Sequence, residues 1–349
     1  MASRNRIQLN SEIFKKLIVH AEAHGDPILN ADKARWIARL SDEDAALMSK
    51  AKIIQYQKIT RHIQVLETEY GDCHFYSMWG FSDFDTLPDG LIEVELTPGH
   101  FSISASETDI APSASAVFIR DVIEGEYQGS DGGYNGHSLG DIADLFPKIC
   151  IVQTDPNYFY TTDIYRVIGT LSSQSYFDGP IDLDAKTLSG ISEIFQSGPE
   201  YVPYEIILQG LMSISWKGFF VDLYRCVEQL YPVPMLEKLA DMLGEKRSLY
   251  ELSDLLEKQL AWRPKEDASL EQLLAKAPDE IVDGFCSVFE ISASDKAKKT
   301  HAVARKVYAT RNNLVHFRPA VSSDEISTKD TNELLFWMTK FVAHLYQAY

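Results

Sequence analysis

The residues best suited to chemistry in this sequence lie near its carboxyl end, in the stretch RNNLVHFRPA at 311–320. Arg311 supplies a permanently charged guanidinium, Asn312 an amide, and His316 an imidazole whose charge changes near neutral pH. A guanidinium can bind a phosphate while an imidazole gives or takes a proton. Together these side chains could hold a phosphate and move a proton beside it.

The three residues fall at the end of a predicted helix over 297–317, which Pro319 terminates. A projection at about 100° per residue separates an apolar stripe, expected to pack on neighbouring helices, from a polar one. The apolar stripe comprises Val303, Val307, Thr310, Leu314 and Phe317. The polar stripe comprises His301, Arg305, Tyr308, Asn312 and His316. Arg311 lies on the flank between the two stripes.

This helix is the strongly basic segment of an acidic chain. Between Asp295 and Arg318 there are seven basic residues and one acidic residue, whereas the whole chain has a net charge of -18. That charge disfavours indiscriminate binding to nucleic acids or anionic membranes, so any RNA contact should be local. An ordinary solvated helix face is the alternative interpretation, although such a face usually mixes Glu with Lys.

The order of residues in RNNLVH at 311–316, Arg, then a polar residue, then His, resembles the R-x4-6-H motif of HEPN domains. The position agrees, since one further helix is predicted over 331–346. The resemblance covers roughly 190–349. It implies a helical domain that dimerises so that two motifs share one cleft. Catalytic members are metal-independent endoribonucleases, many of them toxins or antiphage effectors that act by abortive infection.

The resemblance also implies roles for individual residues. His316 would act as general acid or base on the ribose 2′-hydroxyl or the leaving oxygen. Arg311 would hold the scissile phosphate, and Asn312 would orient the imidazole or the phosphate. Residues expected to bind the RNA are Arg305, Lys306, Tyr308 and Arg318. No cofactor is implied, and the expected partners are RNA, a second copy of the chain, and a phage-derived trigger or a regulatory protein.

Two carboxylates on a predicted helix over 206–230 could lie near this cleft. Asp222 or Glu228 could orient an imidazole, but pairing of each with Arg225 on the helix surface is the stronger expectation. Two other functions remain open. The helical domain could be a non-catalytic interaction module, or a regulatory subunit that binds a partner protein. The presence of both Arg311 and His316 favours catalysis.

The first part of the chain predicts an α+β region of mixed helices and a small antiparallel sheet. Helices are expected over 9–70, with a capping box at Ser41 and Asp44 and an apolar stripe through the second helix. That stripe comprises Tyr56, Ile59, Ile63, Leu66 and Tyr70. A β-hairpin is expected from 91–96 and 101–105, with further strands at 116–123 and 148–153.

The second part predicts a helical bundle. The remaining expected helices are 234–243, 249–260, 270–275 and 280–289. With a chain of 349 residues, two domains are expected, a sensing or recognition region over 1–185 and a HEPN-like helical domain over 186–349, divided between about 175 and 200.

Other constellations favour ordinary structural roles. His20 and His24 are one helical turn apart but have no third ligand, so a metal site is not expected. The glycine cluster at 129–140 lacks the GK[ST] sequence of a phosphate loop and indicates a surface loop. Four separated cysteines indicate reduced thiols, and with no export signal or transmembrane pattern we expect a cytoplasmic protein.

Overall fold

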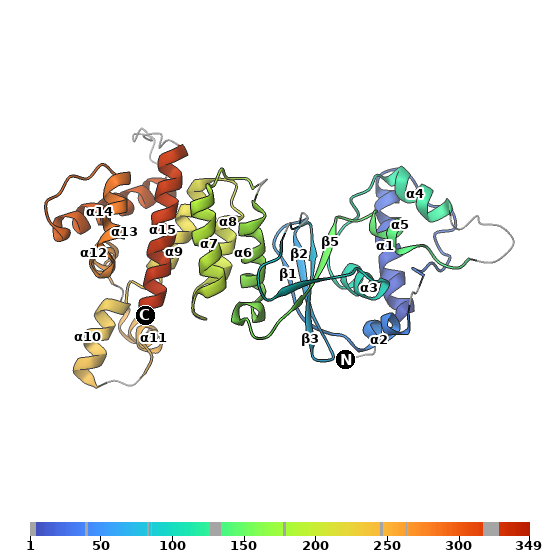
Figure 1. Ribbon diagram of the computed structural model, residues 1–349, viewed down its shortest axis with the longest axis horizontal. Coiled ribbons are helices and arrows are strands. Elements are labelled where there is room, and N and C mark those ends of the chain that lie inside the picture. Colours follow the sequence, from blue (N-terminus) through green and yellow to red (C-terminus); the bar gives the residue numbers. More distant parts are fainter. Residues whose placement is uncertain are drawn as a thin grey trace. The chain divides into compact units, whose positions relative to one another are not determined.

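The computed structural model describes residues 5–38, 41–81, 84, 86–125, 134–176, 179–244, 247–262, 264–316 and 328–349. The chain divides into two compact units, Met1–Ile164 and Tyr165–Tyr349 (Figure 1). The first unit combines helices with a sheet, and the elements described in the second are all helices. The predicted α+β class, with a sheet first and helices after it, is therefore confirmed.

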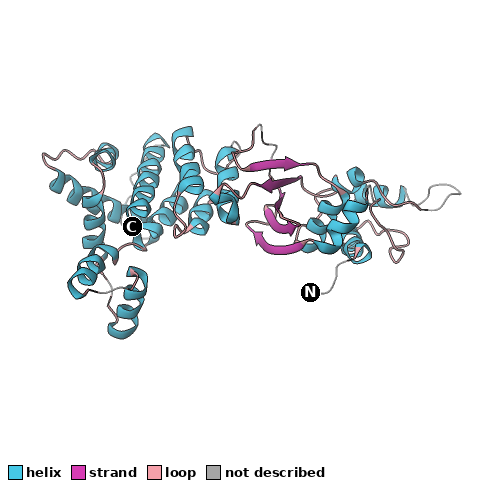
Figure 2. Cartoon of the chain, turned by 60° about the horizontal axis from the view of Figure 1, so that its bottom comes forward, coloured by secondary structure: helices cyan, strands magenta, loops and turns pink. Residues whose placement is uncertain are grey.

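The sheet of the first unit is antiparallel, with strand order β1-β2-β3-β5-β4 (magenta in Figure 2). Its strands are β1 (Lys52–Lys58), β2 (Gln64–Tyr70), β3 (Cys73–Trp79), β4 (Leu91–Val94) and β5 (Ile149–Thr154). Glu67 on β2 lies opposite Tyr76 on β3, which in turn lies opposite Val152 on β5. These three side chains therefore share one face of the sheet.

Helices cover the other face and supply most of the core. They are α1 (Arg6–Ala23), α2 (Asp42–Lys50), α3 (Pro98–Glu107), α4 (Ala116–Gly125) and α5 (Leu139–Ala143). The 3₁₀ helix η2 (Phe159–Thr162) instead lies on the Tyr76 face, where the Tyr76 hydroxyl donates to the carbonyl oxygen of Thr161 at 3.0 Å. Ile13 and Leu17 of α1 are buried against Trp79, Phe101 and Ile119. Their spacing of four residues gives α1 the apolar stripe that the sequence predicts.

The predicted helix after Ser41 is correct at its start and wrong after Lys50. The backbone N–H of Asp44 donates to Ser41 Oγ at 3.3 Å and the N–H of Ser41 donates to Asp44 Oδ2 at 3.2 Å, which completes the capping box. Beyond it, Lys52–Lys58 and Gln64–Tyr70 pair as an antiparallel hairpin. Cross-strand hydrogen bonds satisfy the backbone groups of both segments. The apolar residues spaced three and four apart in this region therefore do not mark a helix, although their spacing suits one.

Two predicted strands are also helices. Thr97 caps α3 by accepting the N–H of His100 at 3.3 Å, and Pro98 occupies the first turn, so the expected turn is a helix start. In α4, Ala116, Ile119 and Ile123 are buried together at helical spacing. The strands predicted at 91–96 and 148–153 are present as the shorter β4 and as β5.

The second unit follows the predicted helices with modest changes of length. Its helices are α6 (Ile164–Gln174), α7 (Ala185–Ser197), α8 (Tyr204–Leu211), α9 (Trp216–Glu228), α10 (Val233–Leu243), α11 (Leu249–Leu260), α12 (Glu266–Lys276), α13 (Asp279–Val288), α14 (Lys296–Val315) and α15 (Thr328–Ala348). The single helix expected over 206–230 is two helices. Ser215 caps α9 by accepting the N–H of Gly218 at 3.4 Å.

The centre of the second unit is α15, which packs on α7, α9 and α13, while α14 packs on α9, α12 and α13 (Figure 1). The predicted domain boundary lay between about 175 and 200, whereas the compact units divide after Ile164. Helix α6 packs with the helical unit: Arg166 donates from Nε to the carbonyl oxygen of Phe195 and from Nη2 to that of Gln196, both at 2.8 Å. These bonds satisfy carbonyl groups at the end of α7.

Candidate active site

The candidate site is built on α14, whose first turn is fixed by Asp295. The Asp295 side chain accepts the N–H of Lys298 at 2.9 Å. The helix ends at Val315, and the backbone N–H of His316 donates to the carbonyl oxygen of Asn312 at 2.9 Å. His316 has left helical geometry, with φ -107° and ψ 106°. The predicted RNA-binding residue Arg318 and the apolar Phe317 lie outside the described residues.

The apolar stripe of α14 packs largely as predicted. Val303 and Val307 are fully buried, whereas Thr310 and Leu314 are half-buried. Ala304 is buried as well. Because the apolar stripe packs on α9, α12 and α13, this packing fixes the direction in which the polar stripe of α14 faces.

Arg311 is held by several partners. Its Nη2 donates to Glu228 Oε1 of α9 at 2.7 Å, and its Nη1 donates to the side-chain oxygen of Asn312 at 2.9 Å. Nη1 also lies 3.7 Å from Glu266 Oε2 of α12. The guanidinium carbon lies 5.6 Å from the ring centroid of Tyr224, a cation–π contact. With 19% of its side chain exposed, Arg311 is pre-oriented while still reachable from solvent.

A buried tyrosine network supports this arrangement from below. The Tyr231 hydroxyl donates to the Tyr224 hydroxyl at 2.5 Å. The hydroxyl of Tyr346 on α15 lies 3.0 Å from the Cys226 carbonyl oxygen and 2.8 Å from Gln229 Oε1. Burial raises the pKa of Tyr224, so this phenol is neutral. Tyr231 thus holds the Tyr224 ring that faces Arg311, and Tyr346 ties α15 to the end of α9.

Arg311 carries one positive charge and lies near two carboxylates, those of Glu228 and Glu266. Burial raises the pKa of Glu228, opposed by the nearby Arg311 charge, and Glu266 raises it further. Burial would lower the pKa of Arg311, but the Glu228 and Glu266 carboxylates outweigh that effect and raise it. The guanidinium is thus charged and faces two acidic side chains.

The structure separates the two carboxylates considered on α9. Asp222 Oδ1 accepts from Arg225 Nη1 at 3.0 Å, as predicted for a pair on the helix surface. Glu228 instead pairs with Arg311, because α14 packs on α9 and brings the guanidinium to it. The expectation that Glu228 pairs with Arg225 is therefore wrong. The His316 side chain is exposed and is bonded to no other side chain within the described ranges.

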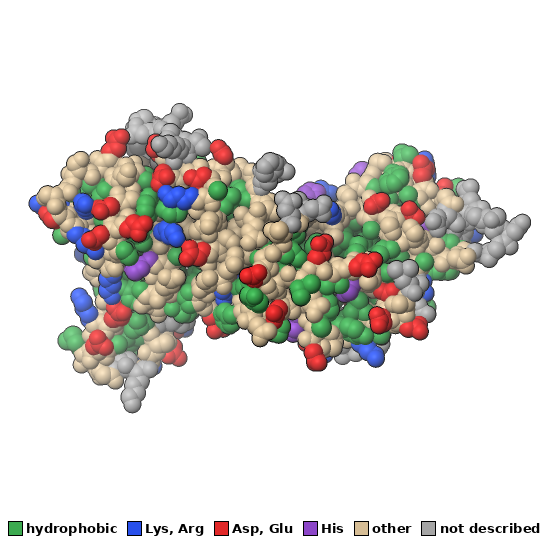
Figure 3. All heavy atoms as spheres, viewed as in Figure 1, with side chains coloured by type: hydrophobic (Ala, Val, Ile, Leu, Met, Phe, Trp, Pro, Cys, Tyr) green, Lys and Arg blue, Asp and Glu red, His purple; other side chains and the backbone are tan. Residues whose placement is uncertain are grey.

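The basic character of α14 is largely compensated by other helices. The pairs are Lys296 with Asp279 at 2.6 Å, Lys299 with Asp283 at 2.6 Å, and His301 with Glu271 at 2.9 Å. Figure 3 shows Lys and Arg side chains interspersed with Asp and Glu over this end of the helical unit. Attraction of RNA by the helix as a whole is weakened accordingly.

Of the remaining residues predicted to bind RNA, Arg305 and Lys306 are exposed and Tyr308 is half-buried. Within the described part of the chain, neither Arg305 nor Lys306 forms an ion pair, so their charges are available to an anionic strand. Tyr308 lies one helical turn before Asn312, close enough along the helix to contact the same bound molecule.

Sequence reasoning missed three residues of the site, Tyr224, Glu228 as the partner of Arg311, and Glu266. The pairing of α14 with α9 and α12 is a tertiary contact, and no spacing within one helix encodes it. The mixed acidic and aromatic sequence of α9 was the available signal, since a carboxylate one turn after a tyrosine can hold a guanidinium over the ring.

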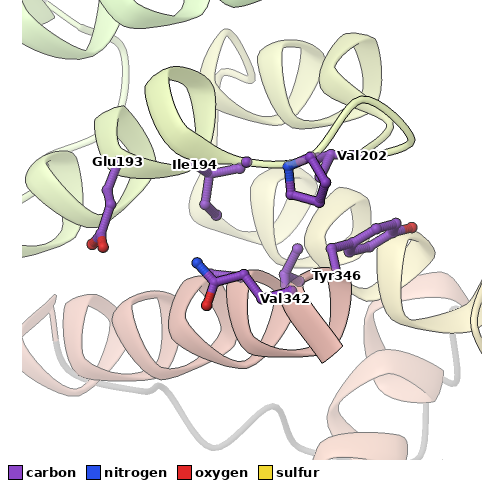
Figure 4. Close-up of a pocket in the computed structure, with 9 residues that line it drawn as sticks. Glu193, Ile194, Val202, Val342 and Tyr346 are labelled. Carbon is purple, nitrogen blue, oxygen red and sulfur yellow. The ribbon is translucent and has the colours of Figure 1, made fainter. Parts of the chain in front are cut away.

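Two pockets lie elsewhere in the helical unit. One is shallow and lies between α7 and α15, where Glu193, Ile194, Val202, Val342 and Tyr346 line it (Figure 4). The other is lined by the ion pairs of Lys296 with Asp279 and of Lys299 with Asp283. Neither includes Arg311 or His316.

Across the described ranges, no group of three or more His, Cys, Asp and Glu side chains is placed to hold a metal ion. The rings of His20 and His24 stack with centroids 4.3 Å apart. In the same ranges, helices that combine the length and the apolar character needed to cross a membrane are absent. The predicted glycine-rich loop at 129–140 falls partly outside these ranges, at 129–133.

Comparisons of the chain with protein-family models, with curated proteins and with solved structures found no match in any of the three.

Proposed function

We propose that this chain is an endoribonuclease that cleaves RNA through Arg311, Asn312 and His316, acting as a dimer with a HEPN-like helical unit. The observation that carries the proposal is the end of α14 itself. A charged guanidinium is held in place by Glu228 over Tyr224, and five residues later the same helix ends in an exposed imidazole. Arg311 also donates to the side-chain oxygen of Asn312, the residue that follows it on the helix.

The chemistry needs few groups because RNA contains its own nucleophile. The ribose 2′-oxygen attacks the adjacent phosphorus, the bond to the 5′-oxygen breaks, and the products are a 2′,3′-cyclic phosphate and a 5′-hydroxyl. An imidazole can take the 2′-hydroxyl proton or give a proton to the leaving 5′-oxygen. A guanidinium stabilises the charge on the phosphoryl oxygens.

A dimer supplies the second proton-transfer group. One imidazole cannot be base and acid in the same step, so His316 of a second copy would complete the pair if the two helix ends face one cleft. The resemblance to HEPN domains favours a protein that uses this activity as a toxin or antiphage effector. The first unit would then recognise a trigger, and a phage-derived component or a regulatory protein would be its partner.

The second candidate is a non-catalytic interaction or regulatory module. The observation that favours it is the pairing of Arg311 with Glu228 and Glu266, since ion pairs between helices also serve stability alone. In that case the exposed His316 would have no chemical role, and its replacement would leave every activity of the protein unchanged.

The two candidates are separated by incubating the purified protein with single-stranded RNA in EDTA. The ribonuclease proposal expects cleavage that His316→Ala and Arg311→Ala both abolish while the dimer persists in sedimentation. The matched control is His301→Ala, an exposed histidine on the same helix that pairs with Glu271 and should leave cleavage intact. Arg311→Lys should retain part of the activity, since it keeps the charge but loses the planar fork.

A further inference from the structure

The guanidinium of Arg311 faces more negative charge than it can neutralise. Glu228 lies at 2.7 Å and Glu266 at 3.7 Å, while the neighbouring Asp222 and Arg225 pair with each other. With all five groups ionised, three acids and two arginines leave a net charge of -1. A phosphodiester that approaches Arg311 therefore meets a repulsive field unless one carboxylate withdraws.

The two carboxylates differ in how firmly they are held. Glu228 forms a short hydrogen bond to Arg311 and its side chain is 27% exposed. Among the described residues, Glu266 makes only the longer ion pair, and its side chain is 45% exposed. Glu266 is also the first residue of α12, where a carboxylate is stabilised by the helix N-terminus whether or not it contacts Arg311. Glu266 can therefore turn to solvent at small cost.

We propose that Glu266 acts as an electrostatic brake on phosphate binding by Arg311, with Glu228 as the fixed partner that keeps the guanidinium in place. A bound phosphate would take the position on Nη1 that Glu266 approaches in the resting chain. The inference rests on the proposed function for its RNA substrate, but it concerns binding of an anionic strand and can be tested without cleavage.

The expected effect follows from the size of an exposed charge interaction. Removing one like charge within a few ångströms of the bound phosphate should tighten binding about two- to fivefold at physiological salt. The gain should shrink as salt is raised, because the carboxylate is partly exposed and screened. In cleavage assays the same change should lower KM and leave kcat unchanged, since Glu266 does not contact the reacting atoms.

The test measures binding of a short fluorescent oligodeoxythymidine strand, which lacks the 2′-hydroxyl and cannot be cut by the proposed reaction. Glu266→Gln should bind it more tightly than wild type. The control is Glu271→Gln, which makes the same change of net charge on the same helix at similar exposure but contacts His301 instead. It should bind as wild type does.

A second pair of variants assigns the effect to Arg311. In an Arg311→Ala background, Glu266→Gln should no longer tighten binding. Three results would overturn the proposal that Glu266 is a brake. They are equal binding by Glu266→Gln and Glu271→Gln, a gain in binding that survives Arg311→Ala, and no binding by any variant. If the binding results hold and wild type cuts no RNA, the ribonuclease proposal fails while the brake stands.

Discussion

Simultaneous replacement of Arg311 and Glu228 should reveal how strongly this pair ties α14 to α9. The two side chains are 19% and 27% exposed and joined by a 2.7 Å charge-assisted hydrogen bond. This places them between exposed pairs, which contribute about 0.2–1 kcal/mol, and buried pairs, whose disruption costs about 3–5 kcal/mol. We expect a coupling free energy of about 1–2 kcal/mol between Arg311→Ala and Glu228→Ala.

Amide hydrogen exchange is the suitable assay because the chain has two compact units and a single unfolding transition is not expected. Exchange of α9 and α14 amides would be compared in wild type, both single variants and the double variant. Each single variant should speed exchange of these helices, and the double variant should add little to the single changes. The coupling free energy is the departure from additivity.

The control cycle uses Lys186 and Glu333, an ion pair at 3.1 Å in the same unit with side chains 45% and 38% exposed. Because both groups are more exposed, their coupling should be clearly smaller than that of Arg311 and Glu228. If the effects of Arg311→Ala and Glu228→Ala on exchange are additive, or if the control pair shows the larger coupling, Arg311 is not held in place by Glu228 and the reasoning is refuted.

Two further predictions concern other parts of the chain. Burial raises the pKa of Glu67, which His74 only partly offsets, so the folded carboxyl keeps its proton to higher pH than the unfolded one. The free energy of unfolding of the first unit should therefore fall as pH rises from about 4.5 through the raised pKa. Glu67→Gln should flatten that fall in the thermal transition of the first unit, and an unchanged profile would contradict this. A Cβ at Gly284 would lie 2.1 Å from the Trp337 ring, so Gly284→Ala should destabilise the helical unit by about 1–3 kcal/mol despite the higher helix propensity of Ala. In the control, Gly125→Ala, the added Cβ meets no atom of the described residues within 4 Å, and an equal loss of stability in both variants would exclude the steric explanation.

The sequence predicted the helical half of the chain well because its signals are local. Apolar periodicity defined α10, α11, α14 and α15 to within a few residues. It failed at the break after α8, since the Met212 to Ser215 turn carries no proline and the apolar pattern runs through it. The cap at Ser215 was the missed signal.

The first unit was harder to predict because a strand depends on its cross-strand partners, some of them far along the chain, as β5 is from β3. The segment Lys52–Lys58 pairs with Gln64–Tyr70, and both carry apolar residues at spacings that also suit a helix. Conversely, Ala116–Gly125 is rich in β-branched residues and is a helix. There the capping and packing of the whole unit outweigh intrinsic propensity.

Within the site, sequence reasoning placed Arg311, Asn312 and His316 together at a helix end, where the structure also has them. It counted charges only along one helix, and so it predicted a positive surface. The acids that compensate it come from α9, α12 and α13, through contacts that a single-helix projection cannot include. The same contacts supplied the two partners of Arg311.

The most direct test of the central claim is the product analysis of one RNA strand cut in EDTA, beside the same strand made with 2′-deoxyribose. The account predicts that wild type cuts only the RNA and leaves 2′,3′-cyclic phosphate ends, and that His316→Ala cuts neither. Intact RNA with wild type under every trigger tried, cleavage of the 2′-deoxy strand, or equal cleavage by His316→Ala would contradict it.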